Sequence, residues 1–225
     1  MTTASVNAID RTRRWEIQWP QPPGNWALEE REVQVWAAPL EATAEGLDKF
    51  ARTLAPEEHE RAGRFLFDRD RERFVVGRGL LRAILGRYLG AEPAEIALAY
   101  GPHGKPTLDG AFAGNRLAFN VAHSAGLAVV AVARDCVLGV DVERVRDLGN
   151  AAEMADRFFS PRESAELRAL PDDQRPAAFI HLWTRKEAFL KATGRGIAEG
   201  LEIIEVTFLP GEAARLISVP ETAMP

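Results

Sequence analysis

The chain has 225 residues, of which 46% are hydrophobic and 27% charged, and its formal net charge is −5. This is the composition of an ordinary globular protein with a sizeable core, and the acidic charge argues against a nucleic acid partner. No apolar run approaches the roughly 20 residues of a membrane-spanning helix, and residues 1–15 lack the apolar core of a secretory signal, so we expect a cytoplasmic protein with no membrane contact.

The first half of the chain predicts one strand followed by three helices. Residues 32–40 alternate as a strand does, and residues 45–54, 55–67 and 68–90 are typical of consecutive helices. The third helix is expected to end at Gly90, with Asp68 or Asp70 as its N-cap. Residues 94–108 predict a strand that runs into a turn, which places His103, Gly104 and Lys105 in a loop.

The second half predicts strands, helices and strands in turn. Residues 117–124, 127–134 and 136–143 are short apolar runs separated by turn residues, which indicates a meander in one sheet. Helices are expected on both sides of Ser160, which can serve as an N-cap, and over residues 177–194; strands are expected within 201–211 and 213–219. The single cysteine, Cys136, lies in an apolar stretch, which favours a buried side chain without a catalytic role.

Three carboxylates are candidate metal ligands. Asp141 and Glu143 lie two residues apart on a predicted strand, so both should point to one face and repel each other. Mg²⁺ would compensate them, although a solvated strand end is the simpler interpretation. Glu187 falls within the apolar arc of the helix 177–194, with Lys191 at the edge of that arc. A buried carboxylate must be paired or bound to metal, whereas the alternative is a surface pair between Glu187 and Lys191.

A second set of candidates is cationic. The loop GPHGKP (residues 101–106) has glycines that allow an anion to approach, and Lys105 and His123 could neutralise phosphate oxygens. The loop is not a Walker motif, and an ordinary turn is the alternative. Between residues 61 and 87, eight arginines stand against Asp68, Asp70 and Glu72, which leaves room for a phosphorylated ligand or simply a solvated face.

The segments GKP, FNxxHS, GVDVE and WTRKEAFLKATGRG, in this order, resemble those of the 4′-phosphopantetheinyl transferases of the Sfp type. The resemblance covers roughly residues 61–208. It implies an α+β fold in which two similar α/β subdomains are related by a pseudo-twofold axis. Residues 1–118 would form the N-terminal half and residues 119–225 the C-terminal half of a monomer, with coenzyme A bound in the cleft between them.

The resemblance also implies roles for individual residues. Asp141, Glu143 and Glu187 would bind Mg²⁺, Lys191 would hold the pyrophosphate, and Glu187, or else Asp141, would act as the general base. The positions matched to coenzyme A binding are Arg61, Arg73, His103, Gly104, Lys105, Pro106, Ala122, His123, Ser124 and Lys191. Three positions depart from the family: Ala122 stands where relatives often have serine, and Glu58 and His59 stand where some have lysines.

The implied activity is transfer of the 4′-phosphopantetheine arm of coenzyme A to a serine of an acyl or peptidyl carrier protein, with release of adenosine 3′,5′-bisphosphate. Two alternatives are a Mg²⁺-dependent coenzyme A or nucleotide pyrophosphatase and a non-catalytic module that binds coenzyme A or a carrier. The helix pattern of pyrophosphatases, REx2EE, is absent from the sequence. A binding module would have no need of the metal.

Overall fold

The computed structural model describes residues 26–196 and 200–220. The first half of the described chain contains β1 (Val33–Pro39), α1 (Ala44–Ala51), α2 (Pro56–Gly63), α3 (Asp68–Leu89), β2 (Leu98–Tyr100), β3 (Pro106–Leu108), β4 (Leu117–Ser124) and β5 (Leu127–Arg134). The second half contains α4 (Ala151–Phe158), α5 (Pro161–Ala169), α6 (Arg175–Thr193), β6 (Glu205–Val206) and β7 (Leu216–Ser218). Helices and sheets are thus mixed, as the predicted α+β class requires.

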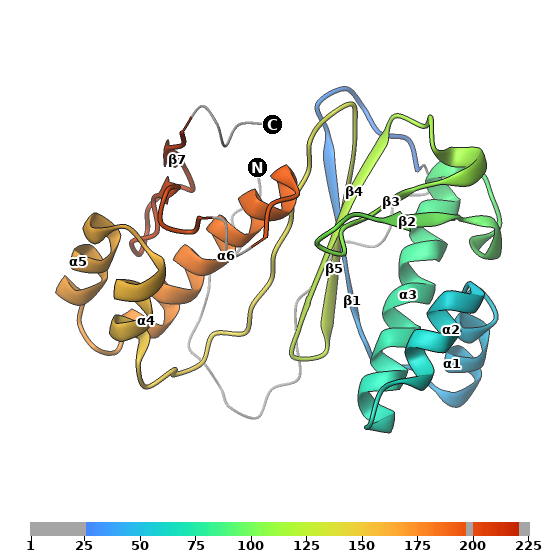
Figure 1. The fold of residues 1–225 in the computed structure, drawn as a ribbon, viewed down its shortest axis with the longest axis horizontal. Coiled ribbons are helices and arrows are strands. Elements are labelled where there is room, and N and C mark those ends of the chain that lie inside the picture. Colours follow the sequence, from blue (N-terminus) through green and yellow to red (C-terminus); the bar gives the residue numbers. More distant parts are fainter. Residues whose placement is uncertain (1–25, 197–199, 221–225) are drawn as a thin grey trace.

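A three-stranded antiparallel sheet with the order β1-β5-β4 lies near the middle of the molecule. Figure 1 shows α1, α2 and α3 on one side of this sheet and α6 on the other. The first seven residues of β5 are all buried, because the strand is central and covered on both faces. Leu81 and Leu85 of α3 pack with Phe119, Val130 and Val132 of the sheet. This core holds α3 in place against the sheet.

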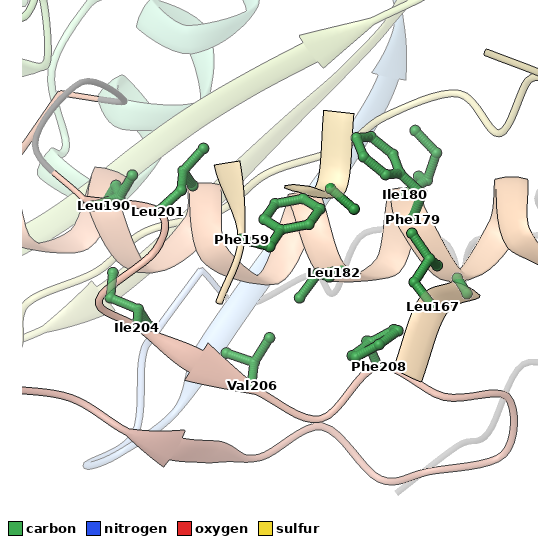
Figure 2. Close-up of a cluster of buried hydrophobic side chains, with 12 residues drawn as sticks. Phe159, Leu167, Phe179, Ile180, Leu182, Leu190, Leu201, Ile204, Val206 and Phe208 are labelled. Carbon is green, nitrogen blue, oxygen red and sulfur yellow. The ribbon is translucent and has the colours of Figure 1, made fainter. Parts of the chain in front are cut away.

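A second core lies among α4, α5, α6 and β6 (Figure 2). Phe159, Phe179, Leu182 and Phe208 are buried there, which orients the middle of α6. The left-handed conformation of Gly194 ends α6, as Gly90 ends α3, and both ends were predicted from the glycines. The predicted boundary between residues 118 and 119 falls within β4, and the sheet takes strands from both sides of it. The division into halves stays a prediction.

Most of the predicted elements are confirmed, but three predictions are wrong. Residues 136–143 form no strand. The chain there packs against the backbone of α6 and hydrogen-bonds to the side chain of Asn120, and it pairs with no neighbouring strand. The N-cap of α3 is Phe67, and the two predicted aspartates lie inside its first turn, where their charge suits the helix dipole. Cys136 is exposed, because the chain leaves the sheet just before it. None of the described helices is both long and apolar enough to cross a membrane.

Candidate active site

The extended segment that follows β5 lies directly against α6. A Cβ atom added to Gly139 would lie 1.9 Å from the carbonyl oxygen of Ala188 and 2.4 Å from the amide nitrogen of Ala192. Only a residue without a side chain allows this approach. The backbone N–H of Val140 donates to Oδ1 of the buried Asn120 on β4, at 2.9 Å. The chain just before Asp141 is therefore held between α6 and the sheet.

Replacing Gly139 by alanine is expected to lower the free energy of unfolding by about 1–3 kcal/mol, because the segment must move away from α6 to make room for the methyl group. Urea denaturation measures the change. Gly114→Ala is the matched control, since nothing lies within 4 Å of a Cβ atom at that position. Equal stability of the two variants would contradict the close approach.

Asp141 meets α6 at the predicted carboxylate site. Lys191 Nζ donates to Asp141 Oδ1 at 2.6 Å, and the Asp141 side chain is 5% exposed. Glu187 is buried one turn before Lys191, as its place in the apolar arc predicts. Burial raises the pKa of Glu187, the negative charge of Asp141 raises it further, and Lys191 opposes the rise. Two acidic side chains from distant segments are thus brought together in a buried place.

The oxygens of this site suit a cation. Asp141 Oδ2 and Glu187 Oε1 are both buried and have no hydrogen-bond partner within the structure. Buried acceptors without donors are costly, and hard oxygen donors are the ligands that Mg²⁺ prefers. Glu143 is arranged differently: it is exposed, and its Oε2 accepts a hydrogen bond from Ser124 Oγ at 2.7 Å. Across residues 26–196 and 200–220, no three His, Cys, Asp or Glu side chains are arranged as a metal site.

A pocket of about 620 Å³ opens between α3, the β2–β3 loop and the β4–β5 turn. Six of the predicted coenzyme A contacts line it: Arg61, Arg73, His103, Gly104, Pro106 and His123. Lys105, Ala122, Ser124 and Lys191 are not among its lining residues. The pocket and the carboxylates are connected through the end of β4, because His123 lines the pocket and the next residue, Ser124, contacts Glu143.

Arg73 has an unused donor at this pocket. Its Nε is buried without a hydrogen-bond partner. Its guanidinium group packs against the β4–β5 turn, where a Cβ atom on Gly126 would lie 3.1 Å from Arg73 Nη2. Gly126 has φ +87°, a conformation that also favours glycine. A partly exposed arginine whose Nε has no partner is suited to bind an anion.

Lys105 lies in the predicted loop but is directed elsewhere. Its Nζ donates to the carbonyl oxygens of Ala192 at 2.9 Å and Leu138 at 3.3 Å. Burial lowers the pKa of Lys105. In this structure the residue therefore joins the β2–β3 loop to the C-terminal end of α6 and to the segment that carries Asp141. Ala122, the position where relatives often have serine, is buried in β4.

Sequence reasoning missed the roles of three residues near the site. Asn120 holds the Asp141 segment, Arg78 lines the pocket, and Lys186 is fully buried beside Glu187. Two signals were present: Asn120 interrupts an apolar strand, and Lys186 is one of only four lysines in the chain. Nothing local singled out Arg78 among eight arginines.

Two family models together match nearly the whole of the chain that the structure describes. Residues 39–135 match the family described as "4′-phosphopantetheinyl transferase, N-terminal", and residues 137–224 match the "4′-phosphopantetheinyl transferase superfamily". The 4′-phosphopantetheinyl transferase HetI of Nostoc is 45% identical over 90% of this chain and 85% of its own length. The 4′-phosphopantetheinyl transferase Sfp of Bacillus subtilis is 29% identical over 79% of this chain and 76% of its own. The similarity therefore extends over both cores and the site between them.

Proposed function

The chain belongs to the 4′-phosphopantetheinyl transferase superfamily, and we infer that it moves the 4′-phosphopantetheine arm of coenzyme A onto a serine of an acyl or peptidyl carrier protein. Adenosine 3′,5′-bisphosphate is the second product. The observation that carries this proposal is a basic pocket joined through β4 to a buried pair of carboxylates. A phosphate-rich substrate and a proton acceptor are what the transfer needs.

Coenzyme A is proposed to occupy the basic pocket. Arg61, Arg73 and His123 would bind its phosphates, and Gly104, the glycine of the β2–β3 loop that lines the pocket, would let the backbone approach the nucleotide. The free donor of Arg73 supports this placement. Lys191 remains the candidate for the pyrophosphate, since its ammonium group already lies at Asp141. Lys105 would bind a coenzyme A phosphate after exchanging its two carbonyl partners, Ala192 and Leu138.

Mg²⁺ is proposed as the cofactor, held by Asp141, Glu143 and Glu187. The unpartnered buried oxygens of Asp141 and Glu187 support two of these ligands. Glu143 would complete the set after exchanging its hydrogen bond with Ser124. When bound, the ion would stabilise the negative charge that develops on the pyrophosphate.

Proton removal is assigned to Glu187, with Asp141 as the second candidate. The carrier serine must lose its proton as its oxygen forms a bond to the phosphorus next to the pantetheine arm. The bond from that phosphorus to the bridging oxygen of the pyrophosphate breaks, and adenosine 3′,5′-bisphosphate leaves. Glu187 has an unpartnered oxygen, Oε1, next to Asp141, and this oxygen can accept the serine proton. Asp141 is already paired with Lys191, which makes its oxygen a weaker acceptor. Lys191 would stabilise the charge on the leaving group.

The arrangement of the whole enzyme is also a proposal. We take the two halves to be related by a pseudo-twofold axis, with coenzyme A between them, in a monomeric cytoplasmic enzyme. The two successive family matches, over 39–135 and 137–224, support a division into halves.

Incubation with coenzyme A, Mg²⁺ and an apo-carrier tests the function. Intact mass should show that the carrier gains one phosphopantetheine group, and adenosine 3′,5′-bisphosphate should form only when the carrier is present. Removal of Mg²⁺ by a chelator should slow transfer at least about tenfold, and added Mg²⁺ should restore it. Release of the bisphosphate without a carrier would indicate a pyrophosphatase, and an unmodified panel of apo-carriers would indicate a binding module.

A further inference from the structure

We propose that Arg78 is a third cation of the pocket and binds the 3′-phosphate of coenzyme A, so that it helps the enzyme distinguish coenzyme A from its 3′-dephospho form. This inference rests on the proposed function. The family resemblance assigned no role to Arg78, and the structure places it in the pocket wall.

Two aromatic rings hold the Arg78 guanidinium group in place. Arg78 lies on α3, one turn after Phe74, and its side chain is 15% exposed. The guanidinium carbon lies 5.6 Å from the centroid of the Phe74 ring and 5.2 Å from that of Tyr100. Contacts of this kind orient a cation without neutralising its charge. The group is therefore fixed before any ligand arrives.

The acidic partner of Arg78 is already occupied. Glu58 lies 3.8 Å from Arg78 Nε, but its carboxylate accepts a bond from Arg82 Nε at 2.8 Å and one from the Tyr100 hydroxyl at 3.2 Å. The backbone N–H of Ala55 also donates to it, at 3.0 Å. One negative charge is thus shared between the buried guanidinium group of Arg82 and the partly exposed one of Arg78. Burial lowers the pKa of Arg78, yet an arginine remains protonated near neutral pH. Arg78 keeps positive charge that an anion can use.

The charge balance of the pocket fits a phosphomonoester. Arg61, Arg73 and Arg78 line it, and Asp70 is the one carboxylate that the described residues contribute to its wall. Arg61 lies over the same Phe74 ring, 5.3 Å from its centroid. The excess of two positive charges matches the charge of about −1.5 to −2 on a phosphomonoester. Coenzyme A carries one such group, the 3′-phosphate.

The position of Arg78 also separates it from the pyrophosphate. The pyrophosphate is assigned to the side of His123 and Lys191, near the carboxylates. Tyr100, which contacts Arg78, lines an adjoining hollow together with Arg61 and Phe65. Arg61 and Phe65 line both the pocket and this hollow, and Arg78 lines the pocket while contacting Tyr100 of the hollow. The 3′-phosphate is attached to the opposite side of the ribose from the 5′-pyrophosphate, so we assign it to the Arg78 wall of the pocket.

Arg78→Met removes the charge and keeps a side chain that suits a helix. We expect kcat/KM with coenzyme A to fall about 10–100-fold, mainly through KM, because a hydrogen-bonded contact between charged groups is lost. With 3′-dephospho-coenzyme A, kcat/KM should stay within about twofold of the wild type, since that substrate lacks the group that Arg78 binds. Arg87→Met is the control, because Arg87 is exposed on the last turn of the same helix.

A binding measurement makes the test independent of turnover. By calorimetry, Arg78→Met should weaken adenosine 3′,5′-bisphosphate about 10-fold or more and leave 5′-AMP unchanged, while Arg78→Lys should lie between the two proteins. Equal losses for both nucleotides, or for both forms of coenzyme A, would overturn the proposal, as would no loss at all. If the wild type binds the bisphosphate but transfers nothing to carriers, the proposed function is wrong. The assignment of Arg78 is then decided by the calorimetric comparison of the two nucleotides alone.

Discussion

Replacing Glu187 by glutamine is expected to slow phosphopantetheine transfer by about 10²–10⁴-fold, the usual contribution of a general base. Glutamine has nearly the same shape as glutamate but cannot accept the serine proton. It is also a weaker ligand for Mg²⁺, so the rate is measured at saturating Mg²⁺, where the remaining loss reports the missing base. Coenzyme A should still bind, because none of the residues that line the pocket is changed. Single-turnover transfer to an apo-carrier measures the rate, and calorimetry with coenzyme A measures the affinity.

Three features of Glu187 explain why its replacement is expected to slow transfer so strongly. Glu187 is buried, its Oε1 has no donor in the structure, and Asp141 lies close enough to raise its pKa. Glu153→Gln is the control, because that carboxylate is exposed on α4. A variant that transfers at nearly the wild-type rate would remove Glu187 from the role of base. Loss of coenzyme A binding together with transfer would make Glu187 a binding residue instead.

Local signals in the sequence predicted most of the helices and strands. The glycines that end α3 and α6 adopt the left-handed conformation, and Ser160 caps α5 in a capping box with Glu163. Such features depend on neighbouring residues and can be read from a short window. The segment 136–143 could not be predicted in this way. It alternates like a strand, but its contacts are the backbone of α6 and the side chain of Asn120, which lie far from it in sequence.

The candidate site shows the same limit. Glu187 was correctly predicted to be buried, because helical spacing places it on the apolar side of α6. The partners of Lys105 lie 33 and 87 residues away, so the sequence could predict its loop but not its contacts. Arg78 contacts the ring of Tyr100, which comes from β2, and lies 3.8 Å from Glu58 of α2, whose carboxylate is bonded to Arg82. The density of arginines suggested a phosphate ligand. Only the packed structure shows which of these arginines line the pocket.

The lysine beside Glu187 has a structural role of its own. Lys186 and Glu163 are both fully buried and form an ion pair between α6 and α5. Lys186 Nζ also donates to the carbonyl oxygen of Leu201 at 2.7 Å, and Glu163 Oε1 accepts from the backbone N–H of Val206 at 3.0 Å. This pair therefore joins two helices to the segment that leads into β6. It also fixes the rotation of α6 that directs Glu187 to Asp141.

Lys186→Met is expected to lower the free energy of unfolding by about 3–5 kcal/mol, because it leaves the Glu163 carboxylate buried without its counter-charge. Adding Glu163→Gln should recover a large part of the loss, since a neutral amide oxygen still accepts from Val206 and carries no charge that needs compensation. Urea denaturation of the two variants measures both steps. Lys49→Met is the matched control, because its pair with Glu45 is exposed and contributes about 0.5 kcal/mol. If Lys186→Met unfolds no more easily than Lys49→Met, the buried pair does not hold α6 in place.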